Sequence, residues 1–149
     1  LFRKKFTLRN IKFYVNILLN VDERLGERKF GVNDMSELPQ TFFEDQFRDW
    51  DYKLPNGESA NDVSKRMNEV LSEILENNKD KKIAIVSHGT AISTMLHKWC
   101  DIKLNEEKKL IEIYFNDKLV FDGNWGCPEL FKLEFDGDNN LISIKNIKF

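Results

Sequence analysis

Cysteine and histidine are scarce in this chain of 149 residues, which contains two of each. Cys100 and Cys127 do not make a disulfide framework, and no cysteine or histidine has a partner at the spacing of a metal site. We expect neither a metal nor another cofactor. Because structural disulfides are typical of oxidising compartments, their scarcity favours a cytoplasmic location.

Long apolar runs and an excess of one charge are also missing. No run approaches the roughly 20 apolar residues of a membrane span, and no signal peptide is recognisable. Lysine and arginine number 23 against 25 aspartate and glutamate residues, and the net charge of −2 argues against a general nucleic-acid binder. The composition, 41% hydrophobic and 32% charged, is that of a globular domain with neither a membrane nor a nucleic-acid partner.

Two apolar stretches predict buried strands, at residues 11–19 and 82–87. Between them, Ser59 and Asp62 form a variant capping box, and apolar residues at helical spacing continue to residue 77. A strand, a helix and a second strand are typical of a right-handed parallel crossover. The centre of the sheet is therefore expected to be mainly parallel.

Further elements complete a single three-layer α/β/α domain over residues 1–149. A short helix over 41–50 carries Phe43, Phe47 and Trp50 on one face. The remaining predictions are a helix at 91–100, short strands at 110–115 and 119–121, and an edge hairpin formed by 129–135 and 141–147. The fold class is thus a mainly parallel sheet with an antiparallel C-terminal edge hairpin.

The residues with the strongest chemical context are Ser87-His88-Gly89-Thr90, between the second predicted strand and a helix. Glycine permits a sharp turn and a close approach to a ligand, and the N–H groups at a helix start favour anions. The glycine-containing charged loop over 22–31 should lie at the same sheet edge. The alternative is that His88 only satisfies a local carbonyl, while His97, in mid-helix, is expected to be structural or solvated.

Three segments together resemble the histidine phosphatase superfamily, the phosphoglycerate mutase-like fold. They are residues 25–31 (Leu-Gly-Glu-Arg-Lys-Phe-Gly), residues 55–59 (Pro-Asn-Gly-Glu-Ser) and residues 87–90. Each is weak alone, but their order and their predicted elements match the family over residues 11–147. The resemblance implies a histidine that attacks phosphorus, cations that clamp the phosphoryl oxygens, and a carboxylic acid that protonates the leaving oxygen.

Carried onto this sequence, the resemblance makes His88 the second, phosphate-clamping histidine and Glu27 the acid. It implies that Gly89 and Thr90 offer backbone N–H groups and that Arg28 contacts the substrate, a phosphorylated small molecule. The plainer alternatives are a solvated loop charge for Glu27 and a surface salt bridge for Arg28. Residues 32–54 are expected to select the substrate, with Arg48, Trp50 and Tyr52 as candidates.

One departure from the family is serious, because no Arg-His-Gly occurs in the sequence. The first strand and helix of the family also find no match, so we expect the chain to be incomplete on its N-terminal side. A gap in the sheet would need a partner or a swapped strand, as in a homodimer, to cover its unpaired backbone groups.

The predicted function is a phosphomonoesterase that acts through a phosphohistidine, with the nucleophile absent from this sequence. The alternatives are a non-catalytic phosphate- or partner-binding remnant, and a phosphoglycerate mutase-type phosphotransferase. The glycolytic mutases carry a long insertion rich in arginine and proline, whereas residues 32–54 hold one proline and a Phe-rich helix. That difference favours a phosphatase.

Overall fold

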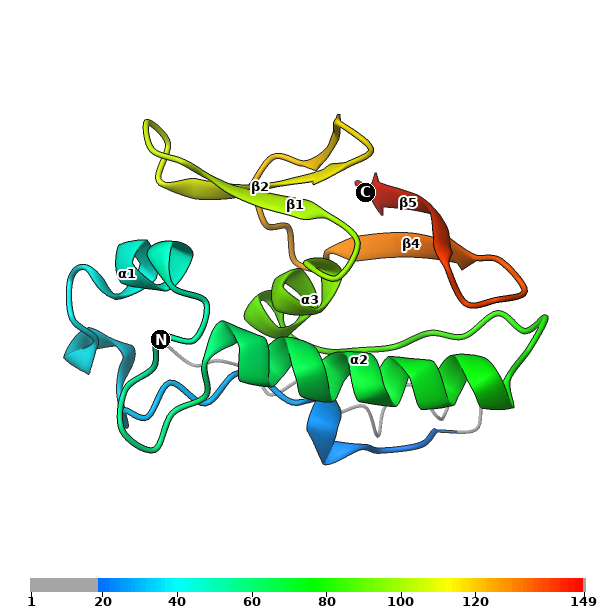
Figure 1. The fold of residues 1–149 in the computed structure, drawn as a ribbon, viewed down its shortest axis with the longest axis horizontal. Helices are drawn as coiled ribbons and strands as arrows, with labels where there is room; N and C mark the ends of the chain where they lie inside the picture. The colour runs from blue at the N-terminus through cyan, green and yellow to red at the C-terminus, as the bar shows by residue number, and fades with distance from the viewer. Residues whose placement is uncertain (1–18, 149) are drawn as a thin grey trace.

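The structure, a computed structural model, describes residues 19–148 and is a mixed α/β fold (Figure 1). Its helices and strands follow one another along the chain. They are the short 3-10 turns η2 (Glu23–Leu25) and η3 (Met35–Glu37), the helices α1 (Phe42–Arg48), α2 (Ala60–Asn77) and α3 (Gly89–Leu96), and the strands β1 (Asp101–Asn105), β2 (Leu110–Phe115), β3 (Lys118–Phe121), β4 (Leu130–Phe135) and β5 (Leu141–Ile147).

Helix α2 begins where the sequence predicts. The Ser59 hydroxyl accepts the backbone N–H of Asp62 at 3.0 Å, and the Asp62 carboxylate accepts the N–H of Ser59 at 3.0 Å. Two N–H groups that the helix ladder cannot satisfy are thereby bonded. Val63, Met67 and Val70 are buried on the inner face of the helix, so the predicted helix and its capping box are confirmed.

Helix α3 lies between α2 and the strands (Figure 1). Its apolar residues meet those of α2 on one side and the inner faces of the β-hairpins on the other. The buried core comprises Val63, Met67 and Leu71 of α2, Ala91, Met95 and Leu96 of α3, Cys100, and Ile113, Phe121, Leu141 and Ile144 from the strands.

The strands form two small antiparallel sheets, one of β1, β2 and β3 and one of β4 and β5. The predicted edge hairpin is confirmed, since Leu130 pairs with Ile147 and Phe135 with Leu141. The short strands at 110–115 and 119–121 are confirmed as β2 and β3. Strand β1, directly after the predicted helix at 91–100, was not predicted; that helix ends at Leu96.

The predicted sheet with a mainly parallel centre is not observed, because both sheets of the described residues are antiparallel. Within the described residues, 82–87 belongs to neither sheet, and Ile83, Ile85 and Val86 are 44%, 37% and 62% exposed rather than covered on both faces. A parallel strand requires a neighbour that supplies ladder hydrogen bonds. The neighbour predicted for it, residues 11–19, lies outside the described residues apart from Leu19.

Helix α1 is confirmed, but its fully buried residues lie outside the predicted apolar face of Phe43, Phe47 and Trp50. Phe42 and Gln46 are buried, whereas Phe43 is 47% exposed. The ring of Phe42 packs edge-on against Phe30 at 5.8 Å and lies 5.4 Å from Tyr52. These contacts come from segments on either side of the helix, so the helical pattern alone could not fix its rotation.

None of the helices within residues 19–148 has both the length and the apolar character that crossing a bilayer requires.

Candidate active site

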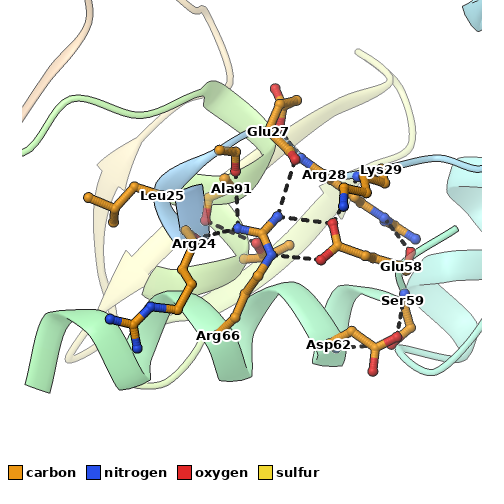
Figure 2. A network of polar contacts seen from close by, with 12 residues as sticks. Arg24, Leu25, Glu27, Arg28, Lys29, Glu58, Ser59, Asp62, Arg66 and Ala91 are labelled. Carbon is orange, nitrogen blue, oxygen red and sulfur yellow. Dashed lines mark hydrogen bonds and ion pairs between the residues drawn. The ribbon is translucent and has the colours of Figure 1, made fainter. Parts of the chain in front are cut away.

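Two arginines hold the loop that carries Glu27 against α2: Arg24 of the loop pairs with Glu73 at 2.7 Å, and Arg66 of α2 binds the backbone of the loop. The Arg66 guanidinium donates to the backbone carbonyls of Arg24 at 2.6 Å, Gly26 at 3.1 Å and Glu27 at 3.2 Å. It also donates to both carboxylate oxygens of Glu58, at 2.7 Å and 3.0 Å. Figure 2 shows the guanidinium between this carboxylate and the loop. The planar, many-donor geometry of arginine suits such a hub.

Glu58 extends this network to the next stretch of the loop. Its carboxylate accepts the backbone N–H of Lys29 at 2.9 Å, and its own N–H donates to the carbonyl of Lys29 at 2.7 Å. The hydrogen bonds from Arg66 hold the pKa of Glu58 below its ordinary value, although partial burial opposes the shift. Glu58 and Arg66 are therefore an ion pair at neutral pH, with side chains only 21% and 18% exposed.

Two glycines let the loops over 29–31 and 55–58 touch through their backbones. Gly31 has φ of +80°, and a Cβ there would lie 2.5 Å from the carbonyl oxygen of Pro55. A Cβ on Gly57 would lie 2.8 Å from the carbonyl oxygen of Phe30. Only glycine permits both the left-handed conformation and this approach. Two of the three segments that resemble the family thus fold as one unit.

Arg28 is surrounded by protein groups and is only 3% exposed. Its Nε donates to the carbonyl of Glu58 at 2.8 Å, and another nitrogen donates to Oε1 of Gln46. The guanidinium carbon lies 5.1 Å from the ring centre of Phe30 and 5.3 Å from that of Phe42. Burial lowers the pKa of Arg28 below its usual range, but an arginine still remains charged at neutral pH.

Glu27 and His88 come together although they are far apart in sequence. Nδ1 of His88 lies 4.0 Å from Oε2 of Glu27, and the two side chains are 58% and 38% exposed. The Ser87 hydroxyl donates to the carbonyl of Leu25 at 2.7 Å and so ties the two segments together. The other oxygen of Glu27 accepts the N–H of Arg28 at 2.8 Å. The predicted meeting of the charged loop and His88 is therefore observed.

Helix α3 begins directly at this pair. His88 is its N-cap residue, with an extended backbone and no side-chain capping bond. The N–H of Ile92 donates to the carbonyl of His88 at 2.9 Å, so the N–H groups of Gly89, Thr90 and Ala91 precede the helical ladder. Those groups carry partial positive charge at a helix start. A histidine, backbone donors and a carboxylate thus converge in one accessible place.

The matched family is the histidine phosphatase superfamily (branch 1), whose model covers residues 1–114 of the 149. The chain belongs to this superfamily. The match includes Glu27, Arg28, His88, Gly89 and Thr90, and so covers every predicted site residue. Neither the curated proteins nor the solved structures contain a match to the chain.

Beside the pair formed by Glu27 and His88, the chain has a cavity of about 290 Å³. Glu27, Gly89 and Thr90 contribute to its wall. Ile102 of β1 and Ile111 of β2 also line it. The remaining residues are aromatic or polar but uncharged, and come from α1 and the turn after it, from α3 and from the segment after β3. These residues are Phe43, Gln46, Phe47 and Trp50, with Ser93, Thr94 and Trp125.

Of the three residues proposed to select the substrate, Trp50 lines this cavity. The Arg48 side chain is 79% exposed and lies 3.7 Å from Asp45. Tyr52 offers its backbone carbonyl to Arg28 at 3.4 Å. Among the described residues, no cluster of three or more histidine, cysteine, aspartate or glutamate side chains is placed to hold a metal ion.

Sequence reasoning missed three residues of the site: Arg66, Gln46 and Trp125. Arg66 lies one residue before the buried Met67 and seven after the Ser59 cap, and an arginine beside a core position of a helix is a usable signal for a buried ion pair. Gln46 and Trp125 give no such signal. Trp125 follows β3 by a short loop, and its place over Gly89, within 3.7 Å of a Cβ built there, depends on the tertiary packing.

Proposed function

We propose that this protein is a phosphomonoesterase, in which His88 and Glu27 form the clamp and acid half of the active site. One observation carries the proposal: in a histidine phosphatase chain, the two side chains approach to 4.0 Å at the start of α3. A phosphoryl group between them would meet a hydrogen-bond donor on one side and a proton donor on the other.

In this proposal His88, when protonated, donates to a phosphoryl oxygen, and the N–H groups of Gly89 and Thr90 donate to the same group. Such donors stabilise the charge on the equatorial oxygens during transfer. Arg28, expected from the sequence to contact the substrate, is instead proposed to position Glu27. Its hydrogen bonds to the carbonyl of Glu58 and to Gln46 hold the backbone of the loop that carries Glu27 in place.

The reaction has two balanced steps. A histidine nitrogen attacks phosphorus, the bond to the ester oxygen breaks, and Glu27 delivers its proton to that oxygen. A water molecule then gives a proton to Glu27 and attacks phosphorus, the bond between phosphorus and the histidine nitrogen breaks, and inorganic phosphate leaves. Neither His88 nor His97, the two histidines of this sequence, is assigned as the nucleophile; the His97 ring stacks on Trp50 with centres 3.7 Å apart.

One observation favours a second candidate, a phosphate-binding protein without turnover. Neither histidine lies in the Arg-His-Gly motif that the family uses for attack. Such a protein would keep the clamp of His88 and the start of α3 but would form no covalent intermediate.

Turnover in the full-length gene product that carries this sequence separates the two candidates. Phosphate release is measured from p-nitrophenyl phosphate and from an alkyl phosphate, together with acid-labile phosphate on histidine. His88→Asn should lower kcat/KM by about 100-fold or more, and Ile142→Ala, at a residue of β5 that is 59% exposed, is the control that should leave it unchanged. Glu27→Gln should cost about 100-fold or more with the alkyl ester and less with p-nitrophenyl phosphate, whose leaving group needs no proton.

Turnover without these losses would contradict the assigned roles. Binding of phosphate without turnover or phosphohistidine would establish the second candidate instead. Absence of both binding and turnover would overturn both.

A further inference from the structure

We propose that the cavity beside Glu27 and Gly89 receives the organic group of the phosphate ester, and that this group is aromatic or apolar and carries no negative charge. The inference rests on the proposed function and deepens it, because it names the class of substrate. It rests on the position, the lining, the charge and the size of the cavity.

The position of the cavity follows from the residues it shares with the phosphate site. Glu27, Gly89 and Thr90 line it, and the same residues are proposed to contact the phosphoryl group and the leaving oxygen. An ester whose leaving oxygen lies against Glu27 therefore directs its organic group into the cavity.

Aromatic rings dominate the wall and are held in place by neighbouring rings. Trp125 lies 4.7 Å from the ring centre of Phe121 and 6.1 Å from that of Phe131. Trp50, also in the wall, stacks on His97 at 3.7 Å and meets Phe47 edge-on at 6.4 Å. Rings fixed in this way offer apolar contact without the entropy cost of ordering flexible side chains.

The charge of the wall disfavours an acidic organic group. Among the described residues that line the cavity, no lysine or arginine occurs. A carboxylate placed there would have no cation in the wall to balance its charge. The arrangement therefore suits neither a phosphoglycerate nor another phosphorylated acid, which also favours a phosphatase over a mutase.

The polar groups of the wall suit uncharged hydroxyl or amino groups. The hydroxyls of Ser93 and Thr94 donate within α3 to the carbonyl of Thr90, at 3.0 Å and 2.9 Å, so each keeps lone pairs that can accept. Gln46 gives its oxygen to Arg28, which leaves its amide NH₂ as the end that can donate. These groups would orient an uncharged substrate rather than bind an ion.

The size of the cavity limits the organic group. An apolar cavity of about 150 Å³ is enough to bind benzene. The cavity here, about 290 Å³, therefore accepts one ring with substituents or two small rings, and not a long chain.

Binding of phosphonates tests the inference without requiring turnover. Methylphosphonate reports the clamp alone, phenylphosphonate adds one ring, and 2-carboxyethylphosphonate adds a carboxylate; each is titrated into the full-length protein by calorimetry. Phenylphosphonate should bind about 10-fold or more tightly than methylphosphonate, whereas 2-carboxyethylphosphonate should gain nothing. Trp125→Ala and Phe47→Ala should remove most of the gain from the ring and change methylphosphonate binding less than about twofold.

Two further variants sharpen the test. Ile142→Ala, on β5 with Ile142 59% exposed, is the matched control and should leave all three affinities unchanged. Phe43→Arg places a cation in the wall through a residue that is 47% exposed, and should reverse the preference in favour of 2-carboxyethylphosphonate.

The outcomes separate this inference from the proposed function. Methylphosphonate that binds independently of His88, or not at all, would overturn the proposed function and this inference with it. Methylphosphonate that binds through His88, with no gain from the ring or a gain that survives in both alanine variants, would overturn the inference alone.

Discussion

Arg66 donates to both carboxylate oxygens of Glu58, at 2.7 Å and 3.0 Å, and the same guanidinium reaches three carbonyls of the loop that carries Glu27. Glu27, the acid of the proposed reaction, therefore lies on a loop whose conformation is fixed by Arg66 of α2. Since neither Arg66 nor Glu58 is exposed by more than 21%, loss of either partner leaves a poorly solvated charge behind.

Arg66→Met should lower the free energy of unfolding by about 2–4 kcal/mol, because it removes charge-assisted hydrogen bonds and leaves Glu58 unpaired. Urea unfolding measures the loss. Arg48→Met is the matched control, since Arg48 is 79% exposed and its ion pair spans 3.7 Å; it should cost less than about 0.5 kcal/mol. Equal losses for the two variants would contradict the role assigned to Arg66.

Gly31→Ala should destabilise the protein by about 2–4 kcal/mol. The new Cβ would require an unfavourable left-handed backbone, and it would lie 2.5 Å from the carbonyl oxygen of Pro55. Gly137→Ala is the control, because a Cβ there meets nothing within 4 Å, and it should change stability by less than about 1 kcal/mol. Thermal unfolding of both variants checks the difference; a Gly31→Ala protein as stable as the control would show that the two loops are not in contact.

The ionisation of Asp62 should make the free energy of unfolding depend on pH in the acidic range. The hydrogen bond from Lys53, followed by those from Ser59, lowers the pKa of Asp62 to about 2 from an ordinary 3.8. The lower value belongs to the folded state, so the unfolded chain takes up the proton first. The stabilisation by ionised Asp62 is present above the ordinary pKa and is lost as the pH falls toward about 2.

Comparison of the wild type with Asp62→Asn measures this effect. The wild type should be more stable by less than about 1 kcal/mol at neutral pH, because the side chain is partly exposed. The difference in stability between the two proteins should disappear as the pH falls from about 4 to about 2. In Lys53→Met, the folded-state pKa of Asp62 moves back toward its ordinary value, so the pH-dependent loss should be smaller and should end at a higher pH. A difference that stays constant over this range would show that the Asp62 carboxylate is not held by these bonds.

Local signals predicted part of this fold well. Ser59 and Asp62 are three residues apart, and both halves of the capping box form between neighbouring backbone groups, so the start of α2 follows from sequence alone. The same holds for the hairpin of β4 and β5, whose turn over 136–140 is rich in aspartate, asparagine and glycine. Where the deciding interactions are close in the chain, the pattern is sufficient.

Long-range contacts account for what the sequence did not predict. The pairing of residues 82–87 depends on which segment lies beside them, and the rotation of α1 depends on Phe30 and Tyr52. The approach of Glu27 to His88 was predicted from strand order and a family resemblance, yet the role of Arg66, which binds the backbone of the Glu27 loop, was not. Trp125 reaches the site through tertiary packing that no local pattern encodes.

The most direct test of the account is a calorimetric titration of inorganic phosphate into the wild type, His88→Asn and His97→Asn. One phosphate should bind per chain, with an affinity lowered about 10-fold or more in His88→Asn, because a hydrogen-bond donor to the phosphate is lost, and with an unchanged affinity in His97→Asn. Phosphate that does not bind, or that binds equally well to all three proteins, would contradict the account.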